Sequence, residues 1–430
     1  MPPRKSARKP PSAAPDVTPT DKPQPTPLPS LLSSSEVERI RAALLGWYRR
    51  GHRDMPWRQL RDPYAIWVSE IMLQQTRVDT VKAYFQRFMA RFPTVAALAA
   101  APADEVLSLW SGLGYYARAR NLHAAAAEIV ARYGGEFPHK EAAVRALPGI
   151  GPYTAGAILS IAFGQQAALL DGNVIRVLAR LRALSASPDT ALGKRLYWSL
   201  SAALVPPPGP SDAATGPSPA PRENDPGDFN QALMELGATV CVPQRPMCLF
   251  CPLSAECAAH QRGQVELYPP KKEARPVPVV EVVTLVLRCR GEVLLVRRPT
   301  AGLWGGLWEP ATLPREPAET EEAAFGRLGR ERLGLDLAGR PAQPLSSFVH
   351  VLTHREMRFT ARLIDWPEAE LLPFLRLSGY EEARLFDLRQ PLALGLSAWV
   401  TTLLGRLAAV PTGGAVRHRN QLQGKMNVQR

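Results

Sequence analysis

Two kinds of hydrophobic pattern follow one another along the chain. From Ser34 to about Tyr268, apolar residues recur at the 3.6-residue spacing of amphipathic helices, for example in RIRAALLGWY, TAGAILSIAF and FNQALMELG. After the break YPPKKEARPVP, the segments PVVEVVTLVLRCRGEVLLVRRP and SSFVHVLTHREMRFTARLI each predict two strands. TEEAAFGRLGRERLG between them predicts a helix that ends at a glycine. We therefore expect an all-α domain over residues 34–268 and a smaller α+β domain over residues 278–408.

Four further segments differ in composition from these two domains. Residues 1–33 are rich in Pro, Ser and Thr and bury too little apolar surface to fold, so we expect a disordered, basic tail. Residues 205–228 are so dense in Pro and Gly that they predict a surface insert between two helices. Residues 269–277 form a predicted linker, and residues 409–430 form a second basic tail.

Length and charge narrow the class of protein. At 430 residues the chain exceeds the size at which a single core keeps growing, which favours two domains. The net charge is +13, and the part of it outside the tails suits either a nucleic-acid partner or solubility alone. No apolar run reaches the roughly 18 residues of a membrane helix, and the N-terminus lacks the apolar core of a signal peptide. We expect a monomer without a membrane partner, acting in the cytoplasm at the nucleoid.

Four of the five cysteines lie in one window with the spacing C-x6-C-x2-C-x5-C: Cys241, Cys248, Cys251 and Cys257. In an intracellular chain, such a cluster indicates a metal centre instead of disulfides. Both zinc and iron-sulfur clusters accept four cysteines, and the spacing alone leaves both open. Cys289 lies alone in a predicted strand, as a buried packing residue would.

A tight turn joins two predicted helices at LPGIGPYTAG, residues 147–156. Gly149 and Gly151 allow the turn around Ile150, and the helix that begins near Pro152 offers unpaired backbone N–H groups to an anion. Such a helix-hairpin-helix element binds a DNA phosphate without reading sequence. An ordinary glycine turn between helices is the alternative interpretation.

The apolar segment WVSEIMLQQTRV, residues 67–78, belongs to a helix with clear start and stop signals. Asp62-Pro63 supplies an N-cap and a proline in the first turn. Thr76 followed three residues later by Asp79 predicts a capping box for the next helix. The first helix is therefore expected to run from Pro63 to about Gln75.

Two carboxylates stand out as candidates for chemistry. Glu70 lies mid-helix beside Trp67, Ile71 and Leu73, where apolar surroundings raise a carboxyl pKa as a general acid near neutral pH requires. A glutamate that points outward from a half-exposed helix is the competing interpretation. Asp171 precedes the helix VIRVLARL and either serves as its N-cap or faces a cationic sugar intermediate.

The motifs SEIMLQQTRV, GLGYYARARNLH, LPGIGPYTAG, LDGNVIRVLAR, FNQALMELG and the cysteine cluster, in this order over about residues 36–270, closely resemble MutY-type adenine DNA glycosylases. The cysteine spacing also resembles the 4Fe-4S loop of the endonuclease III group. The resemblance implies an all-α helix-hairpin-helix domain with a 4Fe-4S cluster held in the loop 241–257, followed by a Nudix-like α+β domain. It implies a repair enzyme that flips adenine, mispaired with 8-oxoguanine or guanine in duplex DNA, and hydrolyses its glycosidic bond.

The resemblance also implies roles for individual residues. Glu70 would protonate the adenine at N7, and Asp171 would stabilise an oxocarbenium-like sugar, the two-carboxylate logic of glycoside hydrolysis. Tyr153 and Asn173 would line the sugar side. The other substrate contacts would come from Trp57, Arg58, Gln231 and Leu73 around the adenine, and from Gln75 and Tyr115 in the base stack. Helix-end polarity for Gln75 and core packing for Tyr115 are the alternatives.

In this family the second domain reads 8-oxoguanine on the opposite strand. A working Nudix hydrolase needs the motif REUxEExGU, with U a bulky apolar residue, but GRERLGLDL retains only Arg330-Glu331 and lacks the Glu-Glu pair. We therefore expect a reader and not a second enzyme. Leu352-Thr353-His354 stands where the family has the signature Phe-Ser-His. Thr353 keeps the hydroxyl of the serine, but Leu352 lacks the aromatic ring of the phenylalanine as a wedge. A plain hairpin turn is the alternative.

Two other functions compete with adenine removal. An endonuclease III-like glycosylase and AP lyase would need a lysine where this chain has Tyr153, because a phenol with an ordinary pKa near ~10 cannot form a Schiff base. A non-catalytic mismatch-binding protein would use the hairpin and the cysteine cluster alone. Tyr153, Glu70 and Asp171 together favour a monofunctional adenine glycosylase.

Overall fold

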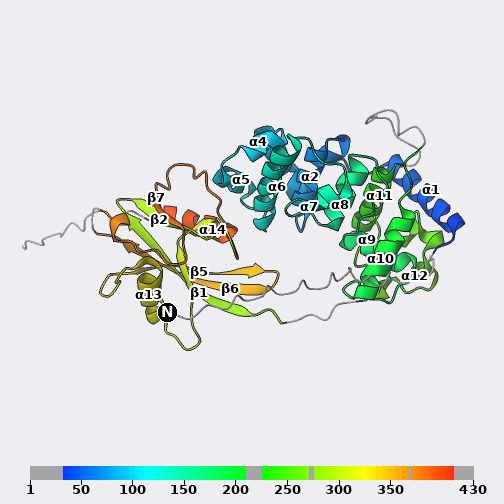
Figure 1. Ribbon diagram of the computed structural model, residues 1–430. Coiled ribbons are helices and arrows are strands. Elements are labelled where there is room, and N and C mark those ends of the chain that lie inside the picture. Colours follow the sequence, from blue (N-terminus) through cyan, green and yellow to red (C-terminus); the bar gives the residue numbers. More distant parts are fainter. Residues whose placement is uncertain (1–31, 210–224, 271–275, 368–369, 411–430) are drawn as a thin grey trace, which may run out of the picture.

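The computed structural model of the chain describes residues 32–209, 225–270, 276–367 and 370–410. Most of the two predicted tails, the middle of the Pro-rich insert and the middle of the linker lie outside the described residues. A helical part extends from Ser34 to Leu267, and a part built on a sheet begins at Val279 (Figure 1). No helix in the described ranges is long and apolar enough to cross a membrane.

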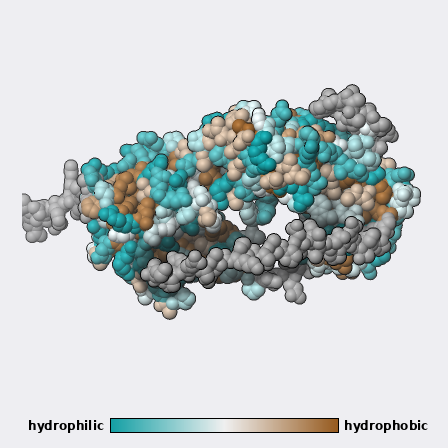
Figure 2. All heavy atoms as spheres, viewed as in Figure 1, coloured by the Kyte–Doolittle hydropathy of each residue, from teal (hydrophilic) through white to brown (hydrophobic). Residues whose placement is uncertain are grey.

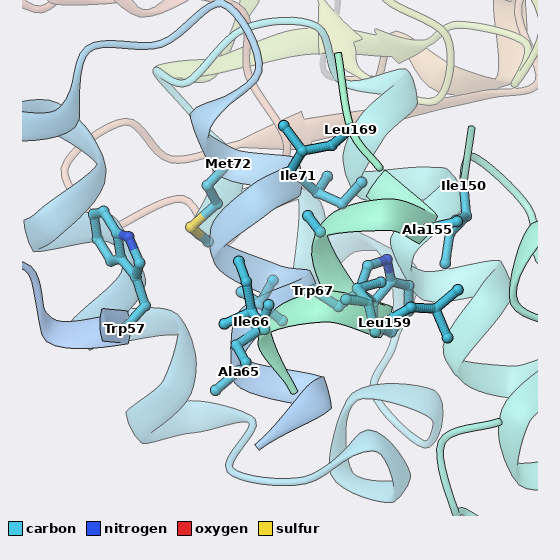
Figure 3. Packing of buried hydrophobic residues seen from close by; sticks show 14 of the residues in the cluster. Trp57, Ala65, Ile66, Trp67, Ile71, Met72, Ile150, Ala155, Leu159 and Leu169 are labelled. Carbon is cyan, nitrogen blue, oxygen red and sulfur yellow. The ribbon is translucent and has the colours of Figure 1, made fainter. Parts of the chain in front are cut away.

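The helical part packs around one hydrophobic core. Its helices are α1 (Ser34–Arg50), α2 (Pro63–Leu73), α3 (Val78–Arg91), α4 (Val95–Ala99), α5 (Ala103–Trp110), α6 (Ala117–Tyr133), α7 (Glu141–Ala146), α8 (Pro152–Ile161), α9 (Gly172–Leu181), α10 (Ala191–Leu204), α11 (Pro226–Thr239) and α12 (Ala258–Gln261). Helices α2 and α8 are buried along most of their length, and Trp67 of α2 lies beside Leu159 of α8 (Figure 3). This buried pair of helices gives the residues on it a fixed position.

Helix α2 begins as the sequence predicts but ends earlier. The Asp62 side chain accepts hydrogen bonds from two backbone N–H groups of the first turn. The helix ends at Leu73, before Gln75, and the predicted capping box at Thr76 is wrong, because α3 follows Arg77 without any side-chain cap. The Thr76 hydroxyl instead accepts a hydrogen bond from the Arg118 guanidinium at 3.3 Å. A contact distant in sequence therefore replaces the local cap.

Helix α11 starts inside the predicted insert. Asp225 is its N-cap and accepts hydrogen bonds from the N–H groups of Gly227 and Asp228 at 2.7 and 3.0 Å. Pro226 occupies the first turn, where a missing N–H costs nothing. The predicted insert is therefore too long at its C-terminal end, because Pro226 begins helix α11 instead of interrupting a helix.

The second part contains a seven-stranded mixed sheet. Its strands are β1 (Val279–Cys289), β2 (Glu292–Arg297), β3 (Trp308–Glu309), β4 (Ala311–Pro314), β5 (Gln343–Leu352), β6 (Arg355–Asp365) and β7 (Glu382–Phe386). The order along the main path is β3-β2-β1-β6-β5, with β4 paired to β1 and β7 to β2. Strands β1 and β6 are parallel, with Val279 opposite Glu356 and Arg288 opposite Asp365, and the other pairs are antiparallel. Both predicted hairpins are confirmed.

Helices cover both faces of this sheet. Helix α13 (Glu321–Leu328) continues into one π-helical turn and ends at Gly334, as predicted, and α14 (Ala398–Ala408) lies near the C-terminal end. Strand β1 contributes Val282 and Val286 to the core shared with α14, and its intervening residues to the core shared with α13. Burial on both sides explains why most residues of β1 are apolar. On the face in Figure 2, hydrophilic residues predominate and apolar residues form separate patches.

Candidate active site

Helices α2, α8, α9 and α11 line a cleft of about 660 Å³. The predicted site residues on its wall are Trp57, Arg58, Glu70, Leu73, Gln75, Gly149, Gly151, Tyr153, Asp171, Asn173 and Gln231. These residues come from segments up to about 170 positions apart in the chain. The fold therefore brings both carboxylates and the hairpin turn to one cleft.

Glu70 lies on α2 with only 5% of its surface exposed, so the outward-pointing alternative is wrong. Burial raises the pKa of Glu70 to about 7, and the nearby Asp171 acts in the same direction. The Tyr153 hydroxyl donates a hydrogen bond to Glu70 Oε2 at 2.6 Å and opposes the rise. Glu70 is therefore able to hold or release a proton near neutral pH, as its apolar surroundings predict.

Asp171 is the N-cap of α9, as its position in the sequence predicts. Its carboxylate accepts hydrogen bonds from the Val174 N–H at 2.7 Å and from the Asn173 side-chain amide at 3.0 Å. Burial raises the pKa of Asp171, whereas these two hydrogen bonds stabilise the anion and lower it. The Asp171 side chain thus both caps α9 and lines the cleft.

Tyr153 faces both carboxylates from α8. Burial, and then the charge of Glu70, raises the pKa of Tyr153 well above its ordinary value, so the phenol stays neutral. Its hydroxyl also lies 3.3 Å from the sulfur of Met234. A neutral phenol at this place donates a hydrogen bond but offers no amine nucleophile.

The sequence interpretation missed a charged group on the wall of the cleft. Glu235 of α11 is 2% exposed and accepts hydrogen bonds from Arg58 and Arg53. Burial acts against ionisation, but these two hydrogen-bonded arginines lower the pKa of Glu235 to about 2. Glu235 follows Gln231 by one helical turn and so lies on the same face of α11, but the two arginines that mark it as special lie far away in the chain. The cleft thus carries a fixed anion held by two cations beside Gln231.

The hairpin turn has the geometry that its glycines predict. Gly149 has φ +76°, and a Cβ atom there would lie 2.6 Å from the Cβ of Asn121. Ile150 is buried and anchors the turn. Gly151 is the N-cap of α8 and provides no side chain to occupy the first N–H groups of the helix. The first N–H groups of a helix have no partner within the helix, and Gly149 and Gly151 both line the cleft.

Tyr115, Thr353 and His354 do not line this cleft. They line a second cavity, of about 430 Å³, between the helical part and the sheet part. Tyr115 is 45% exposed with φ +47°, and its hydroxyl forms a hydrogen bond with the hydroxyl of Thr353 at the β5–β6 turn. Gln75, in the main cleft, has a similar φ of +56°. Tyr115 is therefore no core residue, and it meets the second domain directly.

Side chains in and beside the loop that carries Tyr115 form hydrogen bonds with the backbone of the second domain. The Tyr116 hydroxyl donates to the carbonyl of Leu396 at 2.6 Å, and the Leu396 N–H donates to the Ser111 hydroxyl at 3.1 Å. Arg120 donates to the carbonyl of Gly305 at 2.6 Å. These contacts set the spacing between the two cavities.

The four clustered cysteines are free thiols that line one small cavity. Burial raises the pKa of Cys251 to about 12 and that of Cys248 and Cys257 above the ordinary value. The buried Arg180 guanidinium lies 3.4 Å from the sulfur of Cys241. Four thiols around one cavity with a buried cation beside them suit an anionic metal-thiolate group. In the described residues no three His, Cys, Asp or Glu side chains form a group able to hold a single metal ion.

The cysteine loop is joined to the main cleft through Arg176 of α9. Its guanidinium donates to the carbonyl of Cys241 at 2.7 Å, to the carbonyl of Gly237 at 2.8 Å and to Asn173 Oδ1 at 2.8 Å. Asn173 in turn holds Asp171. Cys289, by contrast, is buried in β1, as predicted.

Comparison with known families agrees with this architecture. Residues 68–201 match the HhH-GPD superfamily of base excision DNA repair proteins, and residues 282–406 match the NUDIX domain. The fold and the cleft thus define a helix-hairpin-helix glycosylase with a Nudix-like second domain.

Individual relatives narrow the class. The adenine DNA glycosylase of Rattus norvegicus is 37% identical over 406 residues, covering 81% of this chain and 76% of the relative. That of Homo sapiens is 38% identical over 379 residues, covering 76% and 66%. That of Buchnera aphidicola subsp. Baizongia pistaciae is 35% identical over 366 residues, covering 85% and 95%. The chain belongs to the adenine DNA glycosylase family, whose members are base-excision-repair enzymes that act on adenine.

Proposed function

We propose that the chain removes adenine mispaired with 8-oxoguanine, or with guanine, from duplex DNA by hydrolysis of the N-glycosidic bond. The observation that carries this proposal is the pair Glu70 and Asp171 in one cleft, with burial raising the pKa of Glu70 to about 7. Adenine inside a duplex cannot reach buried carboxylates, so the base is flipped into the cleft.

Glu70 acts as general acid and protonates adenine N7, which turns the base into a neutral leaving group. Asp171 stays anionic and stabilises the oxocarbenium-like sugar, with Asn173 holding it by a hydrogen bond of 3.0 Å. Tyr153 lies on the sugar side and keeps Glu70 Oε2 in place. Trp57, Leu73, Arg58 and Gln231 form the adenine side, with Glu235 available to accept a hydrogen bond from an exocyclic amine.

A lyase reaction is the weaker candidate. It requires an amine that attacks the sugar, and no lysine is among the described residues that line the cleft. Incubation of lesion duplex with borohydride is expected to trap no Schiff base. An adduct that disappears in Tyr153→Phe would overturn the assignment.

The hairpin N–H groups at Gly149–Gly151 bind a phosphate of the DNA backbone, and Gln75 and Tyr115 enter the base stack near the vacated position. Thr353 and His354, in the second cavity, read 8-oxoguanine on the opposite strand. The second domain does not hydrolyse nucleotides, since the retained Glu331 faces Arg327 at 3.7 Å and the Glu-Glu pair is missing.

A 4Fe-4S cluster is the cofactor that best fits Cys241, Cys248, Cys251 and Cys257, on their spacing and their common cavity. The four thiolates would hold the cluster, and their bonds to it would tie down the loop between α11 and α12. Elemental analysis of protein made anaerobically with ample iron is expected to find iron, with visible absorption. Stoichiometric zinc under those conditions would contradict the cluster.

The direct test is single-turnover release of adenine from matched duplexes that carry A:8-oxoguanine, A:G or A:T. The wild type is expected to cleave the first two and spare the third, and Glu70→Gln is expected to lose at least about 100-fold in rate. Glu38→Gln, on α1 and outside the cleft, is the matched control. Tight binding without any release of adenine would instead support a mismatch-binding protein.

Lesion reading is tested separately. Thr353→Val removes the hydroxyl at nearly constant volume, so it is expected to lower the A:8-oxoguanine to A:G rate ratio with little effect on A:G. Thr401→Val on α14, whose hydroxyl bonds within its own helix, is the control. An unchanged ratio would remove Thr353 from lesion recognition.

A further inference from the structure

Arg118, at the start of α6, is a buried cation that the reaction above does not use. Only 9% of its surface is exposed, and helix α6 lies against α2 (Figure 1). The two terminal nitrogens of its guanidinium lie within hydrogen-bonding distance of six oxygen atoms at the end of α2 and in the loops that follow α2 and α5. They are the carbonyls of Ile71, Met72 and Gln74 at 2.7, 3.0 and 2.6 Å, the Thr76 hydroxyl at 3.3 Å, and the carbonyls of Leu113 and Gly114 at 3.0 and 3.1 Å.

Two of these acceptors immediately precede the residues that enter DNA. The Gln74 carbonyl belongs to the peptide plane before Gln75, and the Gly114 carbonyl to the plane before Tyr115. Rotation about φ of a residue turns the peptide plane that precedes it, so a held carbonyl fixes that φ. Gln75 and Tyr115 have φ of +56° and +47°, a region that side chains other than glycine rarely adopt. One guanidinium thus holds both strained backbones.

The surroundings of Arg118 favour a charged guanidinium over any other group. The carbonyls of Ile71, Met72 and Gln74 form the negative end of α2, the helix that carries Glu70. The rings of Trp110 and Tyr115 flank the cation, with centroids 5.3 and 5.7 Å away. Burial lowers the pKa of Arg118 to about 10, which leaves it charged at neutral pH. A lysine ammonium cannot reach both loops, because it is a point charge without the planar fork.

We propose that Arg118 is a positioning residue that holds Gln75 and Tyr115 as one rigid wedge for opening the base pair. The inference rests on the proposed function, in which these two side chains fill the stack while adenine leaves it. Both are exposed at the protein surface. Apart from the Tyr115–Thr353 hydrogen bond, the direction of each side chain depends on the backbone that carries it. Without the guanidinium, each loop relaxes toward ordinary φ values and the two tips lose their common spacing.

The experiment compares Arg118→Lys with the wild type on two duplexes. In one, adenine faces 8-oxoguanine; in the other, it faces a tetrahydrofuran abasic analogue, where no base pair has to be opened. Single-turnover cleavage by Arg118→Lys is expected to fall at least about 10-fold on the first duplex and less than about 3-fold on the second. Arg132→Lys, an exposed arginine at the far end of α6, is the matched control and changes neither rate.

Equal losses on both duplexes would overturn the proposal, because they would mean that Arg118 merely keeps the helix of Glu70 in place. No loss on either duplex would overturn it as well. If the wild type releases no adenine from either duplex, the proposed function itself fails, a result distinct from both.

A double-mutant cycle, measured at a temperature at which every variant is folded, gives a second test of the proposal. In a Gln75→Ala/Tyr115→Ala background, Arg118→Lys is expected to cost less than about 2-fold on the 8-oxoguanine duplex, because both side chains through which it acts are missing. Full additivity of the two losses would refute the wedge. Thermal unfolding of each variant shows whether a lost rate reflects a lost fold.

Discussion

Glu70 and Asp171 line the same cleft, but the groups around their carboxyls differ. Glu70 lies among apolar side chains that raise its pKa to about 7, with one hydrogen bond from Tyr153. Asp171 is also buried, but it accepts hydrogen bonds from a helix N–H and from Asn173 that favour its anion. Glu70 can therefore hold a proton near neutral pH, whereas the hydrogen bonds of Asp171 oppose the rise that burial causes in its pKa.

The Tyr153 hydroxyl is expected to tune the alkaline limb of the pH profile. Its hydrogen bond lowers the pKa of Glu70, so Tyr153→Phe raises that pKa. Because the acid works in its protonated form, kcat/KM falls as pH rises through the pKa of Glu70, and the variant is expected to move this limb upward by about 0.5–1 pH unit. Tyr197→Phe, which removes a hydroxyl far from the cleft, leaves the limb in place. An unmoved limb in Tyr153→Phe would separate Tyr153 from the acid.

Glu70 is also expected to destabilise the protein at high pH. Its folded pKa of about 7 lies above its ordinary value of 4.5, so its contribution to stability is fully present below pH 4.5 and is lost as pH rises through 7. Glu70→Gln has no such charge, so at pH 8 it is expected to unfold at a higher temperature than the wild type. The gain in free energy of unfolding is up to roughly 3 kcal/mol. At pH 5 the difference nearly vanishes. Equal melting temperatures at both pH values would contradict the buried acid.

Sequence reasoning found the residues whose motif or local pattern was distinctive, and missed a partner that only packing identifies. Glu70 stood out because a carboxylate is rare in an apolar helix. Glu235 did not, since a glutamate on an amphipathic helix is ordinary until Arg53 and Arg58 are known to meet it. Those arginines lie about 180 positions away in the chain, beyond the reach of any local pattern.

At the scale of elements, α9 shows how a carboxylate of the cleft is held by a helix cap. Asp171 caps the helix through the Val174 N–H, and this bond fixes the direction of its carboxylate. The sequence predicted the cap from an aspartate before an apolar helix, and this much is confirmed. The capping box at Thr76 failed for the opposite reason, because Arg118 uses the threonine hydroxyl. Local rules hold at helix ends until a buried side chain competes for the same atom.

The two roles of Asp171 are separable by substitution. Asparagine caps helices as well as aspartate, so Asp171→Asn is expected to keep stability within about 0.5 kcal/mol but to lose cleavage at least about 100-fold. Asp171→Ala loses about 1 kcal/mol in addition. Thr190→Ala, which removes the N-cap of α10, is the control that loses stability alone. Denaturant unfolding and single-turnover rates together make the measurement, and an active Asp171→Asn would reduce Asp171 to a cap.

For the whole molecule, the decisive contacts join the two parts near Tyr115. The sequence predicted both domains and their order, but one chain gives no sign that Ser111 and Tyr116 meet Leu396. These bonds involve the Leu396 backbone, so no residue type marks that side of the contact. The position of Thr353 beside Tyr115 follows from this docking. The cavity beside Tyr115 is therefore formed by residues of both the helical part and the sheet part.

Loosening this docking is expected to affect discrimination more than chemistry. Tyr116→Phe removes the hydrogen bond to the Leu396 carbonyl, so the β5–β6 turn, which we propose reads the lesion, is expected to move more freely relative to the cleft. The A:8-oxoguanine to A:G rate ratio is expected to fall about 3- to 10-fold, with the A:G rate within about 2-fold of the wild type. Tyr133→Phe, at the other end of α6, serves as the control. A uniform loss on both duplexes would show that the docking supports the cleft itself.

The left-handed backbone of Tyr115 has a consequence for variants of this protein. A non-glycine residue at φ +47° costs of order 1 kcal/mol or more, so replacing Tyr115 by glycine relieves strain while removing the ring. Such a variant is expected to fold at least as well as the wild type and to escape the chaperones and proteases that clear unstable proteins. It would accumulate to normal levels in cells while failing at repair. The amount of such a variant in cells is therefore expected to be a poor measure of its repair activity.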